Sequence, residues 1–174
     1  QTLDEHPALR HETANLSSSE ILQLIGATET AAEGLFFPDT YFFFLCSSDT
    51  AILKRAYKVM QNHLNIAWGE REPDLPLKNP YQALILASIV EKETGRENDR
   101  GMVAAVFVNR LRFNMLLQTD PTVIYGMGDR FDGNLRKKDL LTDQAYNTYT
   151  RRGLPPTPIA LPGLASIQAA LNPA

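Results

Sequence analysis

The chain has 174 residues, 44% of them hydrophobic and 21% charged, which is ordinary composition for one globular domain or for one domain with an appendage. A net charge of −3 argues against a general nucleic-acid binder, because such proteins usually carry a basic patch or stripe. The single cysteine, Cys46, excludes an internal disulfide and gives no support to a zinc site. We expect it to be a small apolar filler beside its aromatic neighbours.

The first part of the chain, residues 1–48, alternates short helical patterns with polar breaks. The stretch LSSSEILQLIG predicts a helix with a serine cap before Glu20 and a stop at Gly26. The aromatic stretch EGLFFPDTYFFF favours extended segments around a turn at Pro38. We interpret residues 1–48 as a helical and extended cap region, followed by a main domain over 49–174.

The main domain is predicted to be mostly helical. Cap signals and apolar periodicity predict helices over 49–68, from Asn79 to about Gly95, from near Asp99 through Leu111, in a short stretch that starts at Asp120, and over 164–171. Asp49 or Thr50 is expected to cap the first of these, and Asn79 to cap the second with Pro80 at its first position. Residues 146–163 are interpreted as extended strands and loop. This balance predicts an α+β fold with a minor strand component.

No run of about 18 apolar residues indicates a membrane span, and no signal-peptide pattern opens the chain. The first residue is Gln1 rather than Met. We therefore expect a processed chain or an excised piece, whose membrane anchor would have been lost with the missing start.

The stretch ASIVEKETGRE carries an apolar helical run directly into glutamates. At 100° per residue and with Leu84 set at 0°, Glu93 falls at about 180° and Glu91 at about 340°. The apolar Ile89, at about 140°, lies on the side of Glu93. We therefore expect Glu93 on the apolar face and Glu91 on the wetter face. Desolvation favours the protonated form of a carboxyl, which is the form that a general acid needs. The alternative is that Glu93 lies in a fraying last turn and its carboxylate reaches water.

Two polar clusters are candidates for sugar binding, because amides can form paired hydrogen bonds and tyrosine rings can stack on sugars. They consist of Gln118, Thr119 and Asp120, and of Tyr146, Asn147, Thr148 and Tyr149. Each cluster alone is also typical of an ordinary turn or strand edge. The histidines His6, His11 and His63 are scattered and lack metal-binding spacing, so we expect neither a metal site nor a cofactor.

Several motifs occur together in one order, namely EGLFFPDTY, ASIVEKET, VFVNRL, LQTDPTVIYGMG, AYNTY and GLPPTPI. In this order and spacing they closely resemble the MltG-type endolytic murein transglycosylases, also called YceG-like proteins, over roughly residues 33–172. The resemblance implies a lysozyme-like catalytic domain, here 49–174, that cleaves peptidoglycan glycan strands between N-acetylmuramic acid and N-acetylglucosamine. The family's catalytic glutamate is the second one of EKE, which is Glu93. Lytic transglycosylases of other families commonly have Ser next, where this chain has Thr94.

The resemblance also implies a cellular setting. It implies a bitopic protein of the inner membrane whose catalytic domain lies in the periplasm or on the outer cell surface. Its partners would be peptidoglycan glycan strands and penicillin-binding synthases, with membrane contact only through the anchor. This chain carries neither the N-terminal membrane helix nor the LysM-like domain that family members usually have. They also usually continue past Ala174 with a strand-rich segment, so we expect a fragment.

A lytic transglycosylase can work with one carboxyl group. Protonated Glu93 would donate to the glycosidic oxygen and then, as a carboxylate, take the proton of the muramic acid 6-hydroxyl, which closes onto C1 as a 1,6-anhydro sugar. The remaining residues would bind and position the sugars. These are Gln118, Thr119, Asp120, Tyr125, Tyr146, Asn147, Thr148 and Tyr149.

Two rival functions stay open. One is a lysozyme-type hydrolase, with Asp120 or Asp39 as a second carboxylate. We favour a simpler interpretation of Asp120, whose side chain can cap the helix that begins there. The other rival is a non-catalytic cell-wall binding module or a scaffold for synthetic enzymes.

Overall fold

The computed structural model describes Leu3 and residues 5–174. Helices dominate the fold, and the described residues form one small parallel pair of strands, β1 (Leu9–Arg10) and β2 (Ser47–Ser48). The α-helices are α1 (Ser18–Ile25), α2 (Asp49–Gly69), α3 (Pro80–Glu93), α4 (Arg100–Arg112), α5 (Asp120–Met127), α6 (Lys137–Leu141) and α7 (Leu164–Leu171), and the short 3-10 helices are η1 (Glu97–Asp99) and η2 (Gly128–Arg130). The mostly helical α+β class is thus confirmed.

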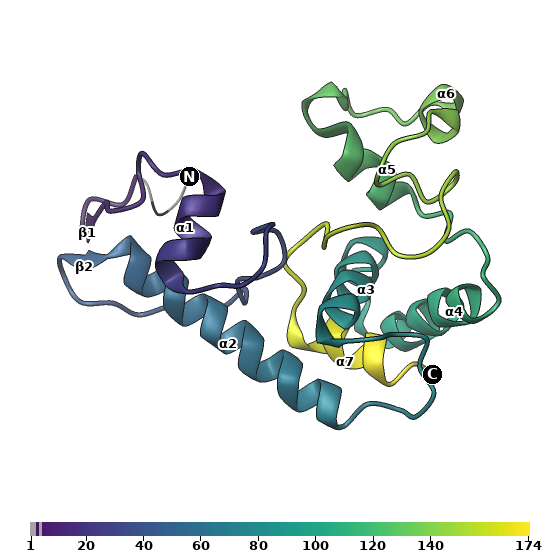
Figure 1. Ribbon diagram of the computed structural model, residues 1–174, viewed down its shortest axis with the longest axis horizontal. Helices are drawn as coiled ribbons and strands as arrows, with labels where there is room; N and C mark the ends of the chain where they lie inside the picture. Colours follow the sequence, from purple (N-terminus) through teal and green to yellow (C-terminus); the bar gives the residue numbers. More distant parts are fainter. Residues whose placement is uncertain (1–2, 4) are drawn as a thin grey trace.

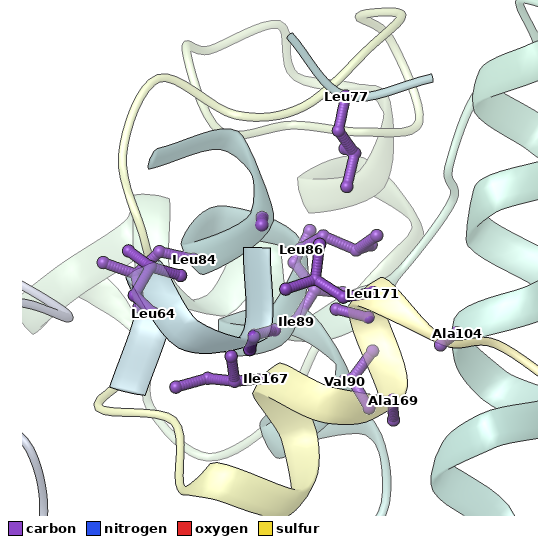
Figure 2. Packing of buried hydrophobic residues seen from close by; sticks show 14 of the residues in the cluster. Leu64, Leu77, Leu84, Leu86, Ile89, Val90, Ala104, Ile167, Ala169 and Leu171 are labelled. Carbon is purple, nitrogen blue, oxygen red and sulfur yellow. The ribbon is translucent and has the colours of Figure 1, made fainter. Parts of the chain in front are cut away.

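Helix α3 is the centre of the molecule. It packs against α2, α4, α5 and α7, and α7 also lies on α2 and α4 (Figure 1). Every residue from 83 to 90 is buried, and Figure 2 shows Leu86 of α3 beside Leu171 of α7. Each fully buried side chain of leucine size stabilises the fold by about 2 kcal/mol. The helix is therefore fixed along its length, and its C-terminal end is a firm platform.

The ends of α3 follow the local chemistry of the sequence. Asn79 caps the helix by accepting a hydrogen bond from the backbone N–H of Gln82, and Pro80 stands in the first turn, as predicted. The last helical residue is Glu93, slightly before the predicted end at Gly95, because Thr94 already has an extended backbone.

The N-terminal region packs through α1 on α2. Ser17 caps α1 in a capping box with Glu20, and Gly26 ends it with a left-handed backbone, both as predicted. The cap of α2 was predicted wrongly, since Ser48 accepts the backbone N–H of Ala51. The strand pair joins Leu9–Arg10 to Ser47–Ser48, which flank residues 11–46. The division of the chain into two regions at residue 48 stays a prediction.

Two further expectations are wrong. The strands predicted over 146–163 do not form, because four prolines in 155–162 lack the N–H that a strand ladder needs, and this segment is loop. Cys46 is exposed rather than packed, with φ at 62°, and Phe42 and Phe44 beside it are 85% and 89% exposed. None of the helices in the described part of the chain combines the length and hydropathy of a membrane span.

Candidate active site

Glu93 lies at the very end of α3, where the buried helix reaches the surface. Its side chain is exposed, and its Oε2 accepts a hydrogen bond of 2.8 Å from the hydroxyl of Thr119. In the part of the chain that the structure describes, no hydrogen bond reaches the other oxygen, Oε1. Glu93 therefore has one oxygen held by the protein and one oxygen open.

Glu91, by contrast, is partly buried and has partners on two neighbouring elements. Its Oε2 accepts hydrogen bonds from the backbone N–H of Gly163 at 3.0 Å and from the hydroxyl of Ser166 at 2.6 Å. Arg100 lies 3.9 Å from Oε1 and also donates to Ser166. Glu91 thereby ties the start of α7 to the end of α3.

The predicted faces of the two glutamates are therefore wrong. The helical count assumed that α3 has an apolar face and a wet face, but α3 is surrounded on all sides up to Val90. Beyond Val90, the exposure of each side chain depends on which neighbouring helix or loop covers it. Tertiary packing sets that cover. The alternative that Glu93 reaches water in the last turn describes its position correctly.

Thr119 reaches Glu93 from a buried cluster of three threonines at the start of α5. Thr119, Thr122 and Thr148 are between 0% and 2% exposed. The hydroxyl of Thr148 accepts the backbone N–H of Thr119 at 3.1 Å, and the hydroxyl of Thr122 donates to the backbone carbonyl of Thr119 at 2.8 Å. The Thr122 and Thr148 hydroxyls lie 2.9 Å apart. The backbone N–H and the backbone carbonyl of Thr119 are thus both hydrogen-bonded to threonine hydroxyls.

Gln118 stands at the rim of the site. It is exposed, its φ of 52° lies in the left-handed region, and its backbone N–H donates to the carbonyl of Thr148. Arg110 of α4 supports the same turn by donating to the carbonyl of Leu117 at 2.5 Å. Gln118 and Thr119 were predicted from their residue types, whereas Arg110 gave no signal, because a single arginine at a helix end is ordinary.

Asp120 does not cap α5, so that expectation is wrong. The cap position is occupied by Thr119, without a side-chain capping bond, and Asp120 accepts the hydroxyl of Tyr149 at 2.5 Å instead. Burial raises the pKa of Tyr149 to about 12, and the hydrogen bond and the charges of Asp120 and Glu93 act in the same direction. Tyr149 therefore stays protonated, and its hydroxyl holds the carboxylate of Asp120 beside the site.

Asn147 is fully buried behind this arrangement. Its amide nitrogen donates to the carbonyls of Asp139, Leu140 and Thr142, and its amide oxygen accepts the backbone N–H of Tyr149. In this structure the amide holds the loop between α6 and Tyr149. Its predicted contact with a sugar stays a prediction.

Tyr125 and Tyr146 form an edge-to-face pair with ring centroids 4.9 Å apart, and the hydroxyl of Tyr146 lies 2.8 Å from that of Thr157. Burial, together with the charge of Glu33 and neighbouring tyrosines, raises the pKa of Tyr125. Both tyrosines are partly exposed to solvent.

Two hollows adjoin the end of α3. One, of about 170 Å³, is lined by Glu93 with Val103, Val106, Phe107, Arg110, Leu117 and Gln118. The other, of about 320 Å³, is lined by Lys92, Pro121, Ile124, Tyr125 and Ile159. Glu93 lines the first hollow, and its sequence neighbour Lys92 lines the second.

The site contains no recognisable metal centre. Among the residues that the structure describes, no three His, Cys, Asp or Glu side chains lie close enough together to hold an ion. The chemistry that this arrangement offers is proton transfer by Glu93, an exposed carboxyl group with a fixed partner.

Comparison with known proteins gives consistent results. The sequence profile of the YceG-like family matches residues 2–174. An endolytic murein transglycosylase of Bacillus subtilis (strain 168) is 40% identical over 144 residues, which is 81% of this chain and 39% of that protein. The endolytic murein transglycosylase of Streptococcus pneumoniae (strain ATCC BAA-255 / R6) is 29% identical over 80% of this chain and 26% of its own length. This chain therefore spans well under half of these relatives.

A crystal structure of a yceG-like protein from Listeria monocytogenes has a similar fold. It aligns with a TM-score of 0.69 at 32% sequence identity and covers 89% of this chain and 54% of that one.

Proposed function

Because the chain belongs to the YceG-like family, we propose that it is the glycan-cleaving part of an endolytic murein transglycosylase. The observation that carries the proposal is Glu93, an exposed carboxyl group with one fixed oxygen and one open oxygen in a hollow. The substrate is the glycan strand of peptidoglycan, and the bond cleaved joins N-acetylmuramic acid to N-acetylglucosamine.

The proposed reaction balances with Glu93 alone. Protonated Glu93 gives its proton to the glycosidic oxygen as the bond from that oxygen to C1 of the muramic acid breaks. The resulting carboxylate then takes the proton of the 6-hydroxyl of the same sugar while O6 forms a bond to C1. The products are a 1,6-anhydromuramic acid end and a new N-acetylglucosamine 4-hydroxyl end. Glu93 is protonated again, and no water is consumed.

The remaining predicted residues divide by exposure. Gln118, Tyr125, Tyr146 and Tyr149 have solvent-facing atoms and are proposed to contact the sugars. The buried Asn147 is proposed to act by holding the loop that carries Tyr149.

The setting belongs to the same proposal. A murein substrate lies outside the cytoplasm, so we propose that the domain works in the periplasm or on the outer cell surface. A membrane anchor in the whole protein and contact with penicillin-binding synthases rest on the family resemblance.

A two-carboxylate hydrolase is the alternative that one observation favours. Asp120 is exposed and interacts with Tyr149, whose pKa is also raised by the charge of Glu93, so a second carboxylate does lie near the site. The Tyr149 hydroxyl donates to Oδ1 of Asp120, so Oδ2 of Asp120 would have to serve as the nucleophile or base of the hydrolase.

Digestion of purified sacculi tests for catalysis against mere binding. We expect the protein to release soluble muropeptide fragments, and Glu93→Gln to release none while it still sediments with sacculi. If Glu93→Gln released fragments at the wild-type rate, the assignment would fail. If the wild type bound sacculi and released nothing, the chain would be a binding module.

A further inference from the structure

The three buried threonines around the start of α5 have no sugar-binding surface of their own. Thr119 and Thr148 are each 2% exposed and Thr122 is 0% exposed, although two of them were predicted to bind substrate. A side chain that is this closed to solvent cannot offer a hydroxyl to a sugar without a local rearrangement. What the cluster does reach is Glu93.

The hydrogen bonds of this cluster form a closed ring that includes both backbone polar groups of Thr119. The N–H of Thr119 donates to the hydroxyl of Thr148, which lies 2.9 Å from the hydroxyl of Thr122, which in turn donates to the carbonyl of Thr119. A buried network in which every polar group is satisfied fixes a single geometry. The backbone of Thr119 is therefore held rigidly, and with it the direction of its side chain.

We propose that Thr119 is the positioning residue of Glu93, held in place by Thr148 and Thr122, and that it reserves Oε1 of Glu93 for proton transfer. This inference rests on the proposed function. The Thr119 hydroxyl can donate to Oε2 when Glu93 is ionised, and it can go on donating to Oε2 when the carboxyl proton lies on Oε1, because Oε2 then remains an acceptor. The same partner can thus orient Glu93 in both protonation states that the reaction passes through.

The two oxygens of Glu93 consequently have different roles. Oε2 accepts a hydrogen bond of 2.8 Å from the Thr119 hydroxyl, and within the described residues Oε1 has no protein hydrogen-bond partner. The proton that goes to the glycosidic oxygen leaves from Oε1, and the proton of the 6-hydroxyl arrives there. An acid that also serves as base must not rotate between the two steps, and a single fixed oxygen prevents that rotation.

The test compares Thr119→Val, which removes the hydroxyl at nearly constant size, with Thr119→Ser, which keeps it. We expect Thr119→Val to lower kcat by roughly 10- to 100-fold, the size expected for the loss of a hydrogen bond to a charged group, with KM changed less than about twofold. Thr119→Ser should keep kcat within about threefold of the wild type. Thr148→Val should follow Thr119→Val, and Thr148→Ser should again restore kcat.

The matched control is Thr13→Val. Thr13 is a buried threonine that also donates to a carboxylate, Asp49, at 2.6 Å, but it lies in the N-terminal region. It should lower thermal stability without changing kcat of the folded fraction. If Thr13→Val lost as much kcat as Thr119→Val, the loss in both variants would follow from lower stability, and this would contradict a positioning role of Thr119.

A second readout does not depend on activity. The carboxyl-carbon NMR signal of Glu93 should shift in Thr119→Val at constant pH, return in Thr119→Ser, and stay fixed in Thr13→Val. An unchanged signal in Thr119→Val, a kcat within twofold of the wild type, or a loss confined to KM would overturn the proposal. An inactive wild type whose Glu93 signal responds as expected would instead count against the proposed function and leave the positioning role supported.

Discussion

Glu91 and Glu93 are two residues apart on one helix, yet their carboxyl groups are used in opposite ways. Glu91 accepts two hydrogen bonds from the start of α7 and faces Arg100, whereas Glu93 is exposed and accepts one hydrogen bond, from Thr119. The difference shows that a carboxylate with two protein donors and an arginine beside it holds elements together. A carboxylate with an open oxygen is free to exchange protons.

The largest expected effect is that of Glu93→Gln. Activity on glycan strands should fall by about 10³-fold or more, because an amide can neither give nor take the proton. Thermal unfolding should be nearly unchanged, since the exposed side chain makes a single hydrogen bond within the described part of the chain. Muropeptide release and calorimetry measure the two quantities. An equal loss of activity in Glu91→Gln, at unchanged melting temperature, would erase the distinction between the two glutamates.

Glu91→Ala should be mainly a stability variant. It leaves the partly buried N–H of Gly163 and the buried hydroxyl of Ser166 without their acceptor, which should cost about 2–3 kcal/mol of unfolding free energy. Urea unfolding measures this cost, and Glu97→Ala, at an exposed glutamate of η1, is the control. A loss below about 0.5 kcal/mol, the size expected for an ordinary surface change, would contradict the structural role of Glu91.

Asp49 extends the comparison to a carboxylate that accepts hydrogen bonds on both oxygens. Burial raises the pKa of Asp49, but hydrogen bonds from Thr13, Thr50 and Glu12 outweigh it, so the pKa lies below its ordinary value. The stabilisation from Asp49 is therefore present above the unfolded pKa, about 4, and is lost as the pH falls further. Asp49→Asn should be less stable than the wild type by about 1–2 kcal/mol at pH 7 and closer to it at pH 3. A stability gap that widens on acidification would have the wrong sign.

Asp120→Asn should have the smallest effect. Asparagine can still accept the Tyr149 hydroxyl, although without the strength of a charge-assisted bond, so activity should fall only about threefold. Kinetic assays on glycan strands can check this value. A loss comparable to that of Glu93→Gln would make Asp120 a second catalytic carboxylate and favour the hydrolase.

Local signals in the sequence predicted the ends of helices well. The Asn79–Pro80 start of α3, the serine cap and Gly26 stop of α1, and the bounds of α7 are all found as expected. Capping depends on a few neighbouring residues, so the sequence alone contains the necessary information.

The surroundings of α3 could not be predicted in this way. This helix has no wet face between Ala83 and Val90, and the packing of α7 and of Arg100 on α4 covers Glu91 but leaves Glu93 open. The roles of Thr122 and Arg110 likewise depend on contacts with residues that the chain brings near only on folding. Family motifs selected Glu93, whereas periodicity predicted the wrong environment for it.

The most direct test of the account is the chemical nature of the chain ends made in heavy-oxygen water. If Glu93 serves as both acid and base, every new muramic acid end is a 1,6-anhydro sugar, lighter by one water than a reducing end and free of heavy oxygen. Reducing muramic acid ends that carry one heavy oxygen atom would contradict the account, because they would show that water and not the 6-hydroxyl attacks C1.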